Sequence, residues 1–355
     1  MTGRSQRDLA LDLMRGYFLF VIAVDHMRFV VNPLYYLTGK MSLWVSAAEG
    51  FVLLSGFLVG KLRGDQARTR GLAAASRHLL RRAGTLALWC AILTISYRVI
   101  SELLGHWPEV PNWDDPGSLL DWILGALVLR RTYGDHNLLA IYALFMLVAP
   151  LGLYLMMRGR TVVFVGASAL LWAASFRFWL RWSNSVQADA SWQLLFVLGM
   201  AAGFHEQRIA ARWAALTDGA RRAIRGAGAV LTVGILAASV ARLQVPVAKQ
   251  PLLEVVLFTR ERLGPGRLAC GLVVVSTLYA YARLYEDRLV RAVGWFLVPL
   301  GQNSLYVYIM QSMLTYLLVD PTLTNPWLAL ATSLAALALI WTFVKNRVLF
   351  GIIPR

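Results

Sequence analysis

The first long apolar segment of the chain, about residues 13–33, carries an arginine and a histidine that could do chemistry together. Arg15 and His26 lie eleven positions apart. On a helix they share one face within about 20° and are separated by about 16 Å along the axis. A neutral imidazole held in this environment can act as a general base near pH 7. A histidine that only hydrogen-bonds to a neighbouring helix is the open alternative.

Two carboxylates are candidates to orient this imidazole. Asp25 directly precedes His26, and Glu49 lies in the second apolar segment, about residues 43–61. If that segment enters from the outer side, Glu49 lies at a depth similar to His26, where a carboxylate can hold the ring and stabilise its protonated form, as in a catalytic triad. A structural hydrogen bond between helices explains Glu49 nearly as well.

Further residues are candidates for binding an anionic, slender ligand. Arg15 lies at the cytosolic end of the first apolar segment, and Arg81 and Arg82 precede the third, about residues 84–104. Guanidinium groups such as these bind phosphates well. Lipid anchoring is the simpler interpretation of this basic run. Ser55, Gly56 and Gly60 show small-residue spacing, which favours close helix packing and is also what a narrow channel requires.

Polar residues near the outer side are candidates for the acceptor. Trp192 and Gln193 open a segment at about residues 191–205, and an aromatic ring beside an amide can stack on a sugar. Asn303 lies with Gln302 and Gln311 in a segment of about residues 296–319 that is too polar to face only lipid. Asn303 and Gln193 could donate hydrogen bonds to a developing oxyanion.

The composition indicates the elements that must position these residues. Of the 355 residues, 58% are hydrophobic and only 15% are charged, and the mean hydropathy is +0.57. A soluble protein carries about a quarter charged residues, so a soluble enzyme or a disordered chain is excluded. The net charge of +16 is typical of basic cytosolic loops beside anionic lipid, and a nucleic-acid partner is not expected.

We therefore predict an all-α, polytopic integral membrane protein with about ten transmembrane helices. Residues 1–355 are expected to form a single transmembrane domain. Most of the Lys and Arg residues fall in loops on the side of the N-terminus, which places both termini in the cytoplasm. The remaining segments are expected at about residues 137–157, 161–176, 226–244, 268–285 and 326–345, with a short interfacial or re-entrant piece at 119–129.

Several motifs resemble the OpgC family, which belongs to the wider acyltransferase-3 group. They are R-D-L-x-x-D-x-x-R-G followed by Asp25-His26, A-A-E-x-F-V-x-L-S-G, and the stretches at 192–203 and 301–308. In the wider group an R-x10-H motif is associated with catalysis, and Arg15 and His26 match it. The resemblance implies about ten helices around a membrane-spanning channel.

The resemblance also implies an activity: transfer of an acyl group, succinyl or acetyl, from cytosolic acyl-CoA to a hydroxyl of an extracytoplasmic glycan or glycolipid. Succinyl-CoA or acetyl-CoA would be the co-substrate, and no metal is expected. The expected location is the inner (plasma) membrane, as a multi-pass protein. Direct transfer and an acyl-histidine intermediate both stay open. A transporter or flippase for an anionic or sugar-linked solute, and a non-catalytic membrane subunit, are the alternative classes.

Overall fold

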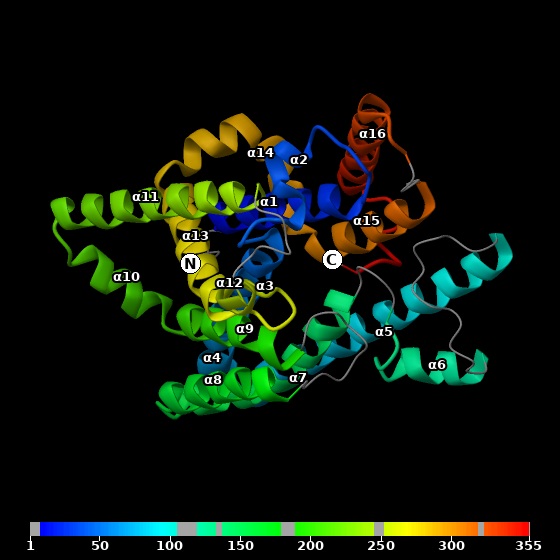
Figure 1. The fold of residues 1–355 in the computed structure, drawn as a ribbon. Coiled ribbons are helices and arrows are strands. Elements are labelled where there is room, and N and C mark those ends of the chain that lie inside the picture. The colour runs from blue at the N-terminus through cyan, green and yellow to red at the C-terminus, as the bar shows by residue number, and fades with distance from the viewer. Residues whose placement is uncertain are drawn as a thin grey trace. The chain divides into compact units, whose positions relative to one another are not determined.

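The computed structural model describes residues 8–104, 119–132, 137–178, 189–244, 252–318 and 323–354, and it is shown in Figure 1. All regular secondary structure in these residues is helical, which confirms the all-α class. The chain forms two compact units that are each discontinuous in sequence. Unit 1 comprises 1–54, 210–259 and 264–355, and unit 2 comprises 55–209 and 260–263. A single domain over 1–355 stays a prediction.

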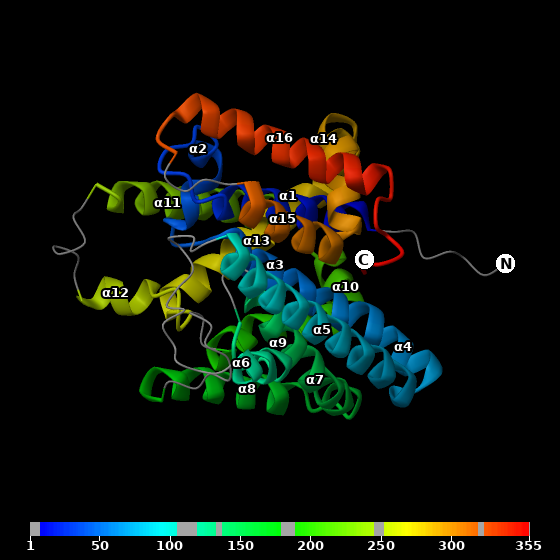
Figure 2. The same cartoon turned by 90° about the vertical axis from the view of Figure 1, so that its right-hand side faces the viewer.

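Unit 1 carries the first helix and the C-terminal helices. Its elements are α1 (Leu9–His26), α2 (Tyr35–Thr38), the 3-10 turn Gly39–Met41, α11 (Asp218–Arg242), α12 (Leu252–Phe258), α13 (Pro265–Leu284), α14 (Glu286–Gln302), α15 (Ser304–Leu318) and α16 (Pro326–Lys345). Figures 1 and 2 show α14 beside α1, and α15 also packs against α1.

Unit 2 contains the central part of the chain. Its elements are the π-helical turn Val59–Arg63, α4 (Gly64–Arg70), α5 (Leu72–Leu104), α6 (Leu119–Leu127), α7 (Asn137–Met157), α8 (Thr161–Arg177) and α9 (Asp189–Phe204). Helices α3 (Ala47–Leu58) and α10 (Glu206–Ala214) contribute residues to both units. Within unit 2, α5 packs along α7 and α8 along α9 (Figure 2).

Glycines set the close packing of α1 against α14. A Cβ atom at Gly16 would lie 2.0 Å from the carbonyl oxygen of Leu297, and one at Gly301 would lie 1.9 Å from that of Asp12. Real side chains cannot occupy such positions, so the two backbones meet at these glycines. The residues on either side of Gly16, including Arg15, are thereby held in a fixed position relative to α14.

The first helix ends earlier than the sequence suggested, at His26 instead of near residue 33. The chain leaves helical geometry at Arg28, whose φ is +51°, and then folds back. Met27 and Phe29 are buried in a cluster with Ala329 of α16, and Asn32 donates a 2.7 Å hydrogen bond to Ser333. These residues thus pack against α16 instead of continuing the helix.

The expected helix at 296–319 is wrong, because the structure has two helices that meet at Asn303. This residue has φ −118° and ψ 40°, outside helical values. Its side-chain amide donates to the carbonyl of Pro299 at 2.8 Å, and Ser304 Oγ donates to the carbonyl of Gly301 at 2.6 Å. These side chains bond to carbonyls of the last turn of α14, which a helix end leaves without intrahelical partners.

Small residues join α9 to the end of α3 and to the turn that follows it. Cβ atoms at Gly56 and Gly60 would lie 2.1 and 2.0 Å from the carbonyl oxygens of Phe196 and Met200. From the other side, a Cβ at Gly203 would lie 1.9 Å from the carbonyl oxygen of Phe57. The packing interpretation of the Ser55-Gly56…Gly60 spacing is therefore confirmed within unit 2.

Apolar helices of membrane-spanning length are present. Five helices in the described residues are long and apolar enough to cross a bilayer: α5, α7, α11, α13 and α16. On α11 the apolar side chains of Val230 and Val233 are exposed, as expected for a surface that faces lipid. These helices indicate a membrane protein. Ten spans and cytoplasmic termini stay predictions, and α6 is short, as expected for an interfacial piece.

Candidate active site

The polar stripe of α1, defined as Asp8, Asp12, Arg15 and His26, faces the C-terminal helices. Asp8 bonds to α13, Asp12 to α14 and His26 to α15. The helix is continuous between Arg15 and His26, so their predicted spacing of about 16 Å on one face holds. The three contacts lie at successive levels along α1, so this face of the helix lies against protein.

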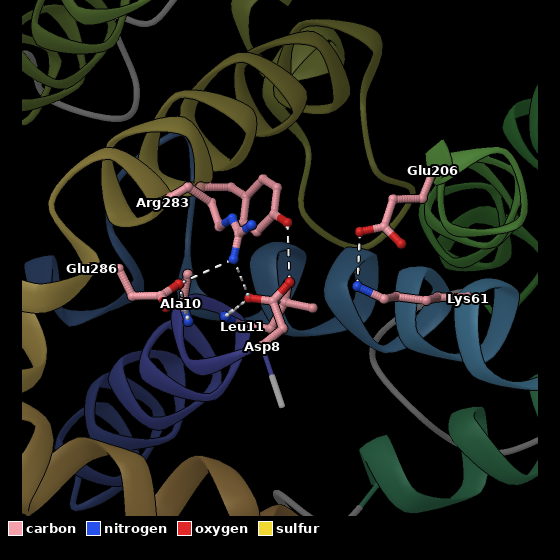
Figure 3. A network of polar contacts seen from close by, with 8 residues as sticks. Asp8, Ala10, Leu11, Lys61, Glu206, Arg283 and Glu286 are labelled. Carbon is pink, nitrogen blue, oxygen red and sulfur yellow. Dashed lines mark hydrogen bonds and ion pairs between the residues drawn. The ribbon is translucent and has the colours of Figure 1, made fainter. Parts of the chain in front are cut away.

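The N-terminal end of the stripe is an ion-pair network, shown in Figure 3. The guanidinium of Arg283 lies 3.4 Å from the carboxylate of Asp8 and 3.1 Å from that of Glu286. Asp8 also accepts from Leu11 N as the N-cap of α1, and Glu286 accepts from Ala10 N at 3.3 Å. The two carboxylates accept hydrogen bonds from N–H groups in the first turn of α1, which have no partner within the helix, and their negative charge complements the positive end of the helix dipole. The positive charge of Arg283 is therefore paired with the carboxylates of Asp8 and Glu286.

One turn further along, Gln302 Nε2 donates to Asp12 at 3.1 Å. Asp12 is buried, and Arg15 is half-buried beside Gly16 at the α1–α14 contact. Arg15, which the sequence predicts to bind phosphate, thus lies on α1 between Asp12 and the apolar part of the helix.

His26 is the last residue of α1 and is half-buried. Its Nδ1 atom lies 3.4 Å from the side-chain amide of Gln311 on α15. Gln311 is only 1% exposed, and its Oε1 atom is buried without a hydrogen-bond partner among the described residues. The sequence predicted that the polar residues of this segment face the bundle interior, and for Gln311 this is confirmed.

Asp25, near the end of α1, bonds to the 3-10 turn Gly39–Met41. Its Oδ2 atom accepts a 3.1 Å hydrogen bond from Met41 N, and the side chain is buried. Met41 and Lys40 have positive φ angles of 57° and 46°, a conformation that costs energy for residues with a side chain. Lys40 Nζ also donates to the carbonyl of Phe29 at 3.1 Å. In the structure Asp25 therefore stabilises a strained turn, and a role in orienting His26 stays a prediction.

Glu49 forms a buried ion pair that the sequence analysis missed. Its carboxylate is bonded to the Nε atom of Arg267 on α13, and the two side chains are 0% and 4% exposed. Glu49 also accepts from Ser46 N at 2.9 Å, and Arg267 Nη1 donates to the carbonyl of Leu43 at 3.3 Å. An arginine directly before the apolar run at 268–275 was the available signal. The structural alternative for Glu49 is thus realised, and the orienting role stays a prediction.

The segment before α3 is fixed from several helices of unit 1. The Trp44 ring stacks on Phe258 of α12, with centroids 4.1 Å apart and planes 12° from parallel. Trp44 N donates to Ser239 Oγ at 2.6 Å, and Arg242 donates to the carbonyl of Ser42 at 3.3 Å. Together with Arg267, these contacts determine where Glu49 lies.

Trp192 and Gln193 serve packing in unit 2. Trp192 is 0% exposed, and its indole nitrogen donates to the carbonyl of Arg260 at 3.1 Å. Gln193 donates to the carbonyls of Ser168 and Ala190 at 2.8 and 3.1 Å and accepts from Ser168 Oγ at 2.7 Å. No ring face of Trp192 is open to a sugar in this conformation, and both amide hydrogens of Gln193 are in use. The stacking and oxyanion roles of this pair stay predictions.

The other residues predicted to bind a ligand lie on α5, on α3 and between α14 and α15. Arg81 is exposed and Arg82 half-buried on α5, which begins at Leu72 and so includes the whole basic run. Ser55 is half-buried beside the glycine contacts of α3 with α9. Asn303 uses its amide to bond to Pro299, as described above. Their binding roles stay predictions.

The end of α9 in unit 2 carries two further polar contacts. Lys61 and Glu206 form an ion pair of 2.8 Å, visible in Figure 3. His205 Nε2 lies 2.8 Å from Thr161 Oγ1. Burial, and to a lesser extent the nearby Arg208 and Arg68, lower the pKa of His205 below its usual value.

The sequence model of the family described as OpgC protein matches residues 7–348, which is nearly the whole chain. The chain belongs to the OpgC family. This OpgC-family membership, with the apolar helices, indicates a membrane acyltransferase-type enzyme that acts on glycans. No curated protein and no solved structure matches the chain.

Proposed function

We propose that this OpgC-family protein transfers an acyl group, succinyl or acetyl, from cytosolic acyl-CoA to a hydroxyl of an extracytoplasmic glycan or glycolipid. The observation that carries the proposal is the stripe of α1, in which Arg15 and His26 share one continuous helix face directed at α13–α15. Family membership supplies the reaction class.

In the proposed reaction His26 is the general base. Its neutral imidazole takes the proton of the acceptor hydroxyl while the oxygen attacks the thioester carbonyl. A carbon–oxygen bond forms, the carbon–sulfur bond breaks, and the imidazolium returns the proton to the departing CoA thiolate. No metal is needed to balance this step. Attack by His26 itself, with an acyl-histidine intermediate, gives the same products.

Arg15 is the proposed contact for the phosphates of the donor. Its position, about 16 Å from His26 along α1, suits a ligand with an anionic end and a thioester at the end of a long arm. Substitution of Arg15 by Gln is expected to raise the KM for acyl-CoA about tenfold or more, with a smaller effect on kcat. Arg81 and Arg82 are proposed as further phosphate contacts, and the same measurement on Arg81→Gln and Arg82→Gln tests them.

The test of the function uses purified protein in lipid nanodiscs with succinyl-CoA or acetyl-CoA and a glucan oligosaccharide. We expect release of free CoA thiol in step with acylated glucan, measured by a thiol reagent and by mass spectrometry. A protein that moves solute across proteoliposomes without consuming acyl-CoA is a transporter or flippase, and this result would overturn the proposal.

A further inference from the structure

The amide of Gln311 is a polar group that the structure places against the ring of His26. The distance from Gln311 Nε2 to His26 Nδ1 is 3.4 Å. The two predicted orienting acids have other partners: Asp25 accepts from Met41 N, and Glu49 is paired with Arg267. Each acid thus has a bond to a group other than the imidazole, and Gln311 is in reach of one ring nitrogen.

The position of Gln311 is fixed by burial and by the start of its helix. The side chain is 1% exposed, so its amide has a restricted set of partners. Helix α15 begins at Ser304, whose hydroxyl bonds back to Gly301, and Tyr306 donates to the carbonyl of Val348 at 2.7 Å. These contacts fix the start of α15, on which Gln311 lies about two turns further along.

Hydrogen-bond chemistry then selects an orientation of the amide. A neutral imidazole has one N–H donor and one acceptor nitrogen. If Nε2 of His26 is to take a proton from substrate, Nδ1 must carry the ring proton and needs an acceptor beside it. The carbonyl oxygen of Gln311 is buried and has no hydrogen-bond partner among the residues that the structure describes, so it is available as this acceptor. A 180° rotation of the amide, which preserves its shape, directs this oxygen at Nδ1, so that the ring N–H and the amide oxygen bond to each other.

We infer that Gln311 is the positioning residue for His26: its amide oxygen accepts from Nδ1–H and leaves Nε2 as the basic nitrogen. This inference rests on the proposed function of His26 as the base. Gln311 fills the part that the acid plays in a catalytic triad, but with a neutral group. A neutral partner holds the tautomer without stabilising the imidazolium as strongly as a carboxylate does.

Three substitutions test whether an acceptor is needed at position 311. Gln311→Glu keeps an acceptor and is expected to retain kcat within about tenfold. Gln311→Met keeps the size but removes the acceptor, and a loss of about 10–100-fold in kcat with little change in the KM for acyl-CoA is expected. Gln66→Met, which removes the amide oxygen that accepts from Arg63 at 2.6 Å, is the matched control and is expected to keep a kcat near wild type.

A spectroscopic measurement separates positioning from a purely structural role. We would label the full chain with 15N-histidine in nanodiscs and identify the His26 signals by their absence in His26→Ala. The wild type is expected to show the Nδ1–H tautomer, and Gln311→Met a shift towards Nε2–H. A wild-type Nε2–H tautomer, or a fully active Gln311→Met, overturns the inference. A fully active His26→Ala would instead overturn the proposed function.

Discussion

The buried ion pair between Glu49 and Arg267 gives the sharpest prediction on stability. Both side chains are almost completely buried, at 0% and 4% exposure. Substituting Glu49 by Ala leaves the guanidinium of Arg267 with the carbonyl of Leu43 as its remaining contact among those described above. Removing one partner of a buried pair costs about 3–5 kcal/mol, because an uncompensated charge stays inside the protein.

This free energy corresponds to a measurable shift in melting temperature. At about 2 °C per kcal/mol for a large chain, Glu49→Ala and Arg267→Ala should each lower the Tm by about 6–10 °C. The double variant Glu49→Leu with Arg267→Met removes both charges and keeps apolar volume. It should recover most of the loss, because apolar replacement of a buried pair is often neutral. In the double-mutant cycle of Glu49→Leu and Arg267→Met with the two corresponding single variants, the coupling energy should be about 2 kcal/mol or more.

The assay is thermal unfolding in detergent micelles, followed by tryptophan fluorescence. Arg221→Ala is the matched control, because Arg221 pairs with Asp218 at a site where the Asp side chain is 85% exposed. This exposed pair should contribute less than about 1 kcal/mol. Single variants that melt within 1–2 °C of wild type, or a double variant that loses the sum of both, would refute the reasoning.

Three further perturbations have definite expected outcomes. The pKa of His205 is lowered in the folded state, so the protein should lose stability as the pH falls below about 6.5. When the Tm is measured against pH, His205→Gln should show a smaller loss at low pH than the wild type. Gly16→Val places atoms against the carbonyl of Leu297 and should cost about 1–3 kcal/mol or more, seen as reduced folded yield on size-exclusion chromatography. Asp25→Ala should destabilise by about 1–3 kcal/mol through the lost bond to Met41 N, whereas Asp25→Asn keeps an acceptor and should melt near wild type.

Much of the helix pattern could be predicted because apolar runs report it directly. The segments at 137–157 and 326–345 match α7 and α16 at both ends. The errors occur where tertiary contacts override the run. Met27 and Phe29 extend the apolar run, yet the helix has ended before them and they pack against α16. The break at Asn303 depends on side-chain bonds to α14 that no periodicity reveals.

For the candidate site, spacing within one helix was predictable and partners between helices were not. The relation of Arg15 to His26 follows from helix geometry alone. The pairing of Glu49 with Arg267 joins residues 218 positions apart, and the contact of His26 with Gln311 joins residues 285 positions apart. Residue types indicated that each needed a polar partner in a membrane, but only the fold determines which one.

The central claim is that the imidazole of His26 takes the proton of the acceptor. Its most direct test is the initial rate of CoA thiol release, with acyl-CoA and glucan saturating, for wild type, His26→Ala and the control His205→Gln. Folded yields would be matched by size-exclusion chromatography. The account predicts a loss of at least about 100-fold in His26→Ala and a rate near wild type in the control. A His26→Ala protein that turns over normally would contradict it.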